Sequence, residues 1–135
     1  MGAAKNLAVH VRWADAEDHH DLSHHSEFIH DDIEVRSPGS EPVIGIEDYI
    51  GMMEGLYVGL KDFHVVVHDR FATDDRVVCR WTTSGTHVGD FSGLPATGKF
   101  LEFPGASIWE FSDGKARRGW TYPGVVVIMQ QLGFG

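Results

Sequence analysis

The segment Lys99–Gly124, KFLEFPGASIWEFSDGKARRGWTYPG, carries the strongest signal for structure in the sequence. Asp113 and Gly114 stand between two runs rich in apolar residues, and both tolerate the positive φ of a type I′ turn. The pattern therefore predicts a β-hairpin with a two-residue loop. In its simplest register Ser112 pairs with Lys115, and the pairing continues regularly along both strands.

A regular register divides this hairpin into two faces, because side chains alternate along a strand with a period of two. It places Glu110 opposite Arg117 and Trp109 opposite Arg118. One face then carries Ser107, Trp109, Phe111, Ala116, Arg118, Trp120 and Tyr122. An isolated buried arginine is costly, so an arginine among aromatic side chains predicts the wall of a pocket for a flat organic molecule.

The composition is that of a globular protein, with 42% hydrophobic and 23% charged residues. A length of 135 residues predicts a single domain over 1–135. The formal net charge of -9, with no basic stripe, argues against nucleic acid and anionic membranes as partners. Cys79 is the one cysteine, which excludes an intrachain disulfide framework. No apolar run resembles a signal peptide or a membrane span, so the expected location is cytoplasmic.

Predicted helices precede predicted strands along the chain. Apolar residues at three- to four-residue spacing predict helices over 3–18, 22–29 and 46–60. Alternating residues predict strands over 33–35, 63–71 and 76–87, a loop over 88–98, and then the hairpin. The apolar tail 125–132 fits either a strand extension or a short helix. This order predicts an α+β fold, in which N-terminal helices pack on the concave face of a curved antiparallel sheet. The opposite face, with Ala106 and Ile108, predicts a partner subunit and hence a homodimer.

Several short motifs are shared with one known family. They are Gly85-Thr86-His87, Gly93-Leu94-Pro95, the Asp113-Gly114 turn and Gln130-Gln131-Leu132-Gly133. With them the chain resembles the SnoaL-like polyketide cyclases of the nuclear transport factor 2-like superfamily. The resemblance implies a cone-shaped α+β barrel around a deep pocket, commonly a dimer or tetramer, and chemistry without a metal or organic cofactor. The best-known members close a polyketide ring by aldol condensation, with a pocket aspartate as general acid and base. Relatives act as hydroxylases, isomerases or hydrolases.

One position departs from this family pattern. Family members usually carry an aspartate four residues after the tryptophan that Trp120 matches, and here that position is Gly124. Thr121 follows Trp120, and no carboxylate side chain occurs between Trp120 and the end of the sequence. The expected function is a cofactor-free cyclase-like enzyme of a biosynthetic pathway, of lyase or isomerase type, acting on a polyketide-like or aromatic molecule. The alternative is a non-catalytic member that binds a small molecule. An epoxide-hydrolase-like reaction ranks last, because the predicted pocket face offers Arg118 without a second acid.

Three residues are candidates for moving protons in place of the aspartate. Tyr122 shares the predicted pocket face with Arg118, whose charge would favour a phenolate and would stabilise an enolate. His87 lies beside the 88–98 loop, and histidine is the natural proton shuttle near neutral pH. Structural roles are the alternatives: a tyrosine at the sheet edge, an arginine stacked on Trp109, and a turn histidine bonded to backbone.

The candidates for binding a hydrophobic substrate are Trp13, Met53, His64, Ser107, Trp109 and Trp120. Their alternative role is ordinary core, because aromatic residues bury large areas in any fold. His19, His20, His24 and His25 form a separate cluster. His20 and His24 have helical i,i+4 spacing, which suits a metal site, but the segment crosses a predicted helix break. We therefore predict an exposed polar junction there and no metal site.

Overall fold

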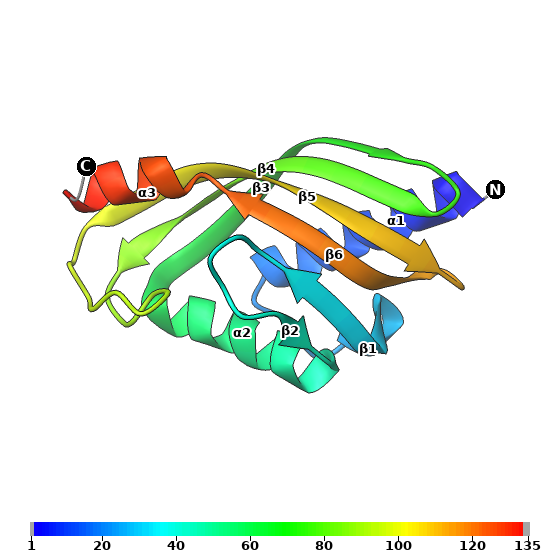
Figure 1. Ribbon diagram of the computed structural model, residues 1–135, viewed down its shortest axis with the longest axis horizontal. Helices are drawn as coiled ribbons and strands as arrows, with labels where there is room; N and C mark the ends of the chain where they lie inside the picture. The colour runs from blue at the N-terminus through cyan, green and yellow to red at the C-terminus, as the bar shows by residue number, and fades with distance from the viewer. Residues whose placement is uncertain (1, 134–135) are drawn as a thin grey trace.

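Six strands form one curved, open sheet in the computed structural model, which describes residues 2–133 (Figure 1). In chain order they are β1 Ile29–Arg36, β2 Val43–Ile44, β3 Leu60–Ala72, β4 Arg76–His87, β5 Phe100–Ser112 and β6 Lys115–Pro123. Their order across the sheet is β2-β1-β6-β5-β4-β3. Neighbouring strands are antiparallel except for β1 and β6, which run parallel, so the sheet is mixed rather than wholly antiparallel.

The helices are α1 Gly2–Asp18, α2 Ile46–Gly59 and α3 Val125–Leu132. Helix α1 packs against β3 and β4, and α2 packs against β1 and β3, so these two helices cover the concave side of the sheet (Figure 1). Helix α3 lies against β5. This arrangement confirms the predicted α+β fold. Within residues 2–133 no helix has the length and apolar character needed to cross a membrane.

The predicted helix over 22–29 is wrong, and the apolar tail forms a helix rather than a strand. Only a 3-10 turn, His25–Glu27, occurs in the first of these regions, and β1 begins at Ile29. Asp21 accepts hydrogen bonds from the backbone N–H and the hydroxyl of Ser23, which favours a turn over a helix. Ile29 then pairs with Ala116 of β6, so strand pairing outweighs a weak local preference for helix.

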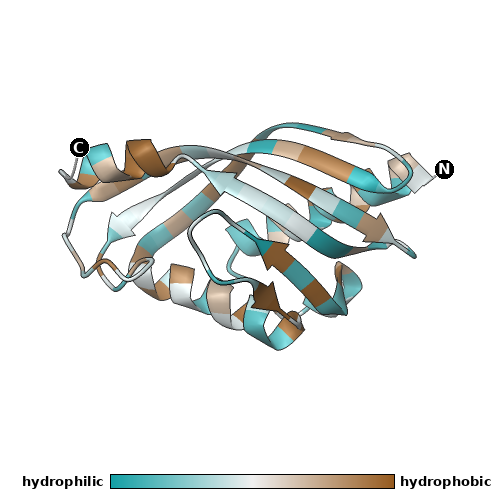
Figure 2. Cartoon of the chain, viewed as in Figure 1, coloured by the Kyte–Doolittle hydropathy of each residue, from teal (hydrophilic) through white to brown (hydrophobic). Residues whose placement is uncertain are grey.

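The hydrophobic core fills the space between the concave face and the two covering helices. Hydrophobic and hydrophilic residues alternate along β1 (Figure 2), where Ile33 and Val35 are buried and Asp32 is exposed. Its buried side chains from the helices and from the inner face of the sheet include Trp13, Tyr49, Met53, Phe63, Phe103 and Trp109. These side chains do not completely fill the space between the concave face of the sheet and the helices, and the remaining space is the cavity described below.

The tight turn of the hairpin is confirmed, but the predicted register beyond it is wrong. Asp113 and Gly114 both have positive φ, and Ser112 pairs with Lys115. The register then shifts by one residue, so that Glu110 pairs with Arg118 rather than with Arg117. A bulge of this kind moves every later side chain of one strand to the other face of the sheet.

Packing against Trp109 explains this register. In the structure Trp109 pairs with Gly119, and a methyl group at position 119 would overlap the indole ring. A larger residue such as Arg118 cannot take this place without displacing the ring. Arg117, at the bulge, donates instead to a carboxylate oxygen of Asp32 at 3.0 Å.

Candidate active site

A cavity of about 690 Å³ lies between the inner face of the sheet and helices α1 and α2. Aromatic side chains dominate its wall: Trp13, Tyr49, Phe63, Trp81, Phe91, Phe103 and Trp109. The loop over 37–41 contributes to its rim. An apolar cavity of this size with a few polar groups is typical of a site for a small organic molecule.

Two tryptophans owe their position to glycines on the neighbouring strand. The ring of Trp81 lies where a side chain at Gly105 would lie, and the ring of Trp109 occupies the corresponding space at Gly119. Both indoles therefore lie close against the sheet, and the cavity remains open in front of them.

A chain of hydrogen bonds crosses the sheet wall of the cavity. The indole Nε1–H of Trp81 donates to Ser107 Oγ at 3.0 Å, and the Ser107 hydroxyl donates to Thr121 Oγ1 at 2.9 Å. Both hydroxyl residues line the cavity. The Thr121 hydroxyl proton has no acceptor among residues 2–133, so it is available to a ligand.

Helix α1 presents a carboxylate, Glu17, to the cavity. His10, Trp13 and Glu17 recur at helical spacing, and all three line the cavity. Glu17 Oε2 accepts three hydrogen bonds: from Trp13 Nε1 at 2.7 Å, Tyr49 Oη at 2.7 Å and His25 Nε2 at 2.9 Å. The side chain of Glu17 is 15% exposed, and its Oε1 has no partner among residues 2–133. A carboxylate that is fixed through one oxygen therefore keeps the other oxygen free.

Tyr49, one of the donors to Glu17, holds its proton. Burial first, and then the charge of Glu17, raise the pKa of Tyr49 well above its ordinary value, so its hydroxyl stays a donor. The thiol of Cys79, which also lines the cavity, has its pKa raised by burial to about 11. Cys79 is therefore a protonated core residue rather than a nucleophile.

Four of the predicted binding residues line the cavity: Trp13, Met53, Ser107 and Trp109. His64 does not. It lies on the outer face, 56% exposed, and its Nδ1–H donates to Asp18 at 2.5 Å. Trp120 pairs with Ile108 on the convex face, so it does not line the cavity either.

The bulge also separates the predicted catalytic residues from the cavity. Arg118 and Tyr122 share the convex face with Trp120, because all three follow the register shift. Tyr122 is 48% exposed, and Arg118 Nε lies 3.8 Å from Glu110 Oε1. Neither Arg118 nor Tyr122 lines the cavity, although the regular register placed both on the predicted pocket face.

His87 is fully buried and lies behind the 88–98 loop. Its Nε2–H donates to the carbonyl of Leu94 at 3.1 Å, and its Nδ1 accepts from the Thr97 hydroxyl at 2.9 Å. Both ring nitrogens are therefore occupied by the loop. Phe91 and Leu94 of this loop line the cavity, whereas His87 itself does not. These contacts are those of a histidine that fixes a turn, which is the structural alternative to a proton shuttle.

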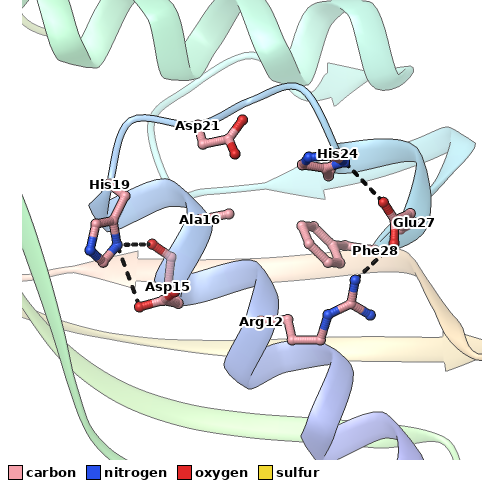
Figure 3. Close-up of a pocket in the computed structure, with 8 residues that line it drawn as sticks. All are labelled: Arg12, Asp15, Ala16, His19, Asp21, His24, Glu27 and Phe28. Carbon is pink, nitrogen blue, oxygen red and sulfur yellow. Dashed lines mark hydrogen bonds and ion pairs between the residues drawn. The ribbon is translucent and has the colours of Figure 1, made fainter.

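The histidine-rich segment surrounds a separate surface hollow of about 410 Å³ (Figure 3). Its histidines bind carboxylates beside them: His19 lies 3.4 Å from Asp15, and His24 lies 3.0 Å from Glu27. The pKa of His19 is raised by a hydrogen bond to the Asp15 backbone and by the Asp15 charge. Within residues 2–133 no three His, Cys, Asp or Glu side chains come together as a metal ion requires.

Glu17, His10 and Thr121 are not among the site residues predicted from the sequence. A signal for the first two exists in hindsight, because positions 10, 13 and 17 share one face of the predicted first helix. Thr121 faces the cavity only because of the bulge in β6, which the sequence pattern did not indicate.

A curved sheet that wraps around an internal cavity and is closed by helices on its concave side defines the nuclear transport factor 2-like class. Within this class, the family model described as SnoaL-like polyketide cyclase matches residues 8–132, and the chain belongs to this family. Among curated proteins, none matches the sequence significantly.

Solved structures agree with this assignment. The chain is similar to a proposed SnoaL-like polyketide cyclase from Jannaschia sp. CCS1, with a TM-score of 0.87, 20% identity, and coverage of 98% of this chain and 94% of the other. It is also similar to AclR, a proposed hydroxylase from Streptomyces galilaeus, with a TM-score of 0.82, 27% identity and coverage of 98% and 87%. A third similar structure is IdmH, a proposed polyketide cyclase from Streptomyces antibioticus, with a TM-score of 0.81, 26% identity and coverage of 95% and 98%.

Proposed function

We propose that this protein is a cofactor-independent, cyclase-like enzyme in which Glu17 takes the acid and base role of the family aspartate. Its substrate is a polyketide-like molecule of a biosynthetic pathway, which binds in the aromatic cavity. The observation that carries the proposal is the position of Glu17: its carboxylate is held on the cavity wall with Oε1 unpartnered among residues 2–133. Membership of the family supports a cyclase-like function in general.

The reaction combines two proton transfers with the formation of one C–C bond. Glu17 Oε1 removes a proton from a carbon between two carbonyl groups, which gives an enolate. The enolate carbon attacks a second carbonyl carbon of the same molecule, a C–C bond forms, and that carbonyl oxygen becomes an alkoxide. The protonated Glu17 then returns its proton to the alkoxide. Carbons between two carbonyls are already acidic, so positioning in the cavity supplies much of the remaining rate.

The family position for the aspartate is tightly packed against Pro104. A side chain at Gly124 would meet the carbonyl oxygen of Pro104 at 3.0 Å and the Pro104 ring at 3.1 Å. A side chain at this position would therefore need a small displacement of Pro104. The other carboxylate of the cavity lining, Glu41, is exposed at the rim, so Glu17 is the better placed acid.

The test is Glu17→Gln, which keeps the shape of the side chain and removes its basicity. We expect turnover of linear β-polycarbonyl aromatic substrates to fall by at least about 100-fold. Glu47→Gln is the matched control, because Glu47 is exposed in the first turn of α2, outside the cavity. A Glu17→Gln enzyme with the rate of the wild type would refute the role of Glu17.

The alternative is a binding protein without turnover. The enclosed aromatic wall and the buried hydroxyl of Ser107 would suit this role equally well. Under this alternative the wild type binds the same aromatic substrates but releases them unchanged. Product analysis by mass spectrometry after long incubation distinguishes the two functions.

We further propose a homodimer that forms through the convex face of the sheet. An apolar row crosses four neighbouring strands there, because Phe71 pairs with Val78, Val78 with Ile108, and Ile108 with Trp120. Phe71 is 65% exposed, and Val78, Ile108 and Trp120 are half-buried, so the row is partly open to solvent in the single chain. A large exposed apolar surface marks an interaction site in a soluble domain.

Charges beside the apolar row favour a second copy of this chain as the partner. Arg76, Glu110 and Arg118 lie opposite one another on three strands, with Glu110 between the two arginines. Arg76 lies 3.2 Å from the Glu110 carboxylate. A row with both signs of charge can face its own copy across a two-fold axis, since each copy then offers the opposite charge.

A further inference from the structure

His10 is held in one chemical form by the residue behind it. His10 is buried on helix α1, with 5% of the residue exposed, and Arg70 Nε of β3 donates a hydrogen bond to His10 Nδ1 at 3.1 Å. A guanidinium has donors and no acceptor. Nδ1 must therefore carry a lone pair, which places the single ring proton on Nε2.

Burial, and next the charge of Arg70, lower the pKa of His10 from its ordinary value of 6.5 to about 4. The ring therefore stays neutral near physiological pH. Neutral histidine with a fixed proton is a hydrogen-bond donor of constant direction, in contrast to a histidine that titrates between pH 6 and 7.

The donor atom faces a place where a ligand can reach it. His10 belongs to the cavity lining, and its Nε2 has no hydrogen-bond partner among residues 2–133. Within residues 2–133, one side-chain polar atom is both fully enclosed and without a hydrogen-bond partner, and this atom is His25 Nδ1. His10 Nε2 has no partner either, but it is not fully enclosed. A donor left without an acceptor costs free energy, so an acceptor in the cavity would be favoured at this point.

We propose that His10 and Arg70 form a subsite that binds a carbonyl or hydroxyl oxygen of the cavity ligand through the Nε2–H of His10. The subsite lies away from the reacting carbon. His10 and Glu17 are seven residues apart on α1, which is a rise on the order of 10 Å, and Trp13 lies between them. The ligand then lies along α1 over Trp13, with an acceptor oxygen at its far end. In the proposed enzyme this subsite would orient the substrate, and this orienting role rests on the proposed function.

The test uses two probes of nearly equal shape, 9-fluorenone and fluorene, which differ by one carbonyl oxygen. We expect the wild type to bind fluorenone about tenfold more tightly, as followed by quenching of tryptophan fluorescence. In His10→Phe this preference should disappear while the affinity for fluorene is retained. His10→Gln should keep part of it, because an amide can accept from Arg70 and donate into the cavity. His68→Phe, on the outer face, is the control and should keep the full preference.

A second measurement does not depend on ligands or on activity. Nitrogen-15 NMR should show the His10 proton on Nε2 in the wild type, and a mixture of tautomers in Arg70→Met. If His10→Phe does not fold, the binding of fluorenone and fluorene is compared in Arg70→Met instead, where the preference for fluorenone should fall.

Equal binding of both probes by the wild type, an unchanged preference in His10→Phe, or a proton on Nδ1 would each overturn the subsite. Glu17→Gln separates the two proposals, because it should lose turnover and keep the preference for fluorenone. If Glu17→Gln keeps its turnover, the acid and base role fails while the subsite remains.

Discussion

At the scale of single residues, the neutral state of His10 makes stability depend on pH. The pKa of His10 is about 4 in the folded chain and returns to its ordinary 6.5 on unfolding. Between these values the unfolded state binds more protons, so stability is complete above pH 6.5 and falls as the pH drops towards 4. The loss from this residue amounts to at most about 3 kcal/mol. Urea unfolding near pH 7 and near pH 4.5 should give a smaller pH effect in His10→Gln, and an equal effect would contradict a buried neutral histidine.

A second residue-scale prediction concerns the glycine under Trp109. In Gly119→Ala the new methyl group overlaps the indole ring, which must move towards the cavity. We expect a loss of about 1–3 kcal/mol in the free energy of unfolding, because overpacking strains the core. Gly51→Ala is the control, since nothing lies within 4 Å of a side chain there, and alanine favours helix α2. Urea midpoints and near-ultraviolet circular dichroism would measure both effects.

At the scale of elements, the 88–98 loop depends on His87. His87→Ala removes the donor to Leu94 and the acceptor for Thr97. The amide of Gly98, which donates to the backbone of residue 87, should then exchange at least about tenfold faster with deuterium. Thr97→Val breaks one of the two side-chain bonds and should cause a smaller effect. Equal exchange in His87→Ala and the wild type would show that other contacts hold this loop.

Elements whose signals are local could be predicted from the sequence. The first helix, the long strands and the Asp113-Gly114 turn follow from spacing and from turn chemistry, which neighbouring residues determine. The bulge could not be predicted, because it depends on Trp109 meeting Gly119 across two strands. The turn was therefore predicted correctly, but one inserted residue beyond it put the later side chains of β6 on the wrong face in the prediction.

The same reason explains which site residues were predicted. Trp13, Ser107 and Trp109 lie on segments whose inward face the pattern indicated, and they line the cavity. Tyr122 lies beyond the bulge and faces outwards. Glu17 becomes a candidate only when Tyr49 and His25, distant in sequence, are seen to fix its carboxylate.

At the scale of the whole molecule, the proposed dimer predicts a change of mass. Ile108→Lys places a charge in the middle of the apolar row on the convex face. We expect light scattering at micromolar concentration to give twice the chain mass for the wild type and a single chain mass for Ile108→Lys. Lys61→Gln, in the exposed part of β3, should leave the dimer intact. A monomeric wild type would refute the dimer.

The parallel pairing of β1 with β6 has a consequence for the order of folding. Of the six strands of this sheet, β1 leaves the ribosome first and β6 last, yet the two lie side by side. Until Lys115–Pro123 has been made, β1 can pair only with the short β2. The nascent chain therefore carries an open strand edge while β2 to β5 are made, and the sheet is complete only after β6. Every truncated chain that ends before β6 keeps this edge exposed, which makes incomplete products the species most prone to aggregate.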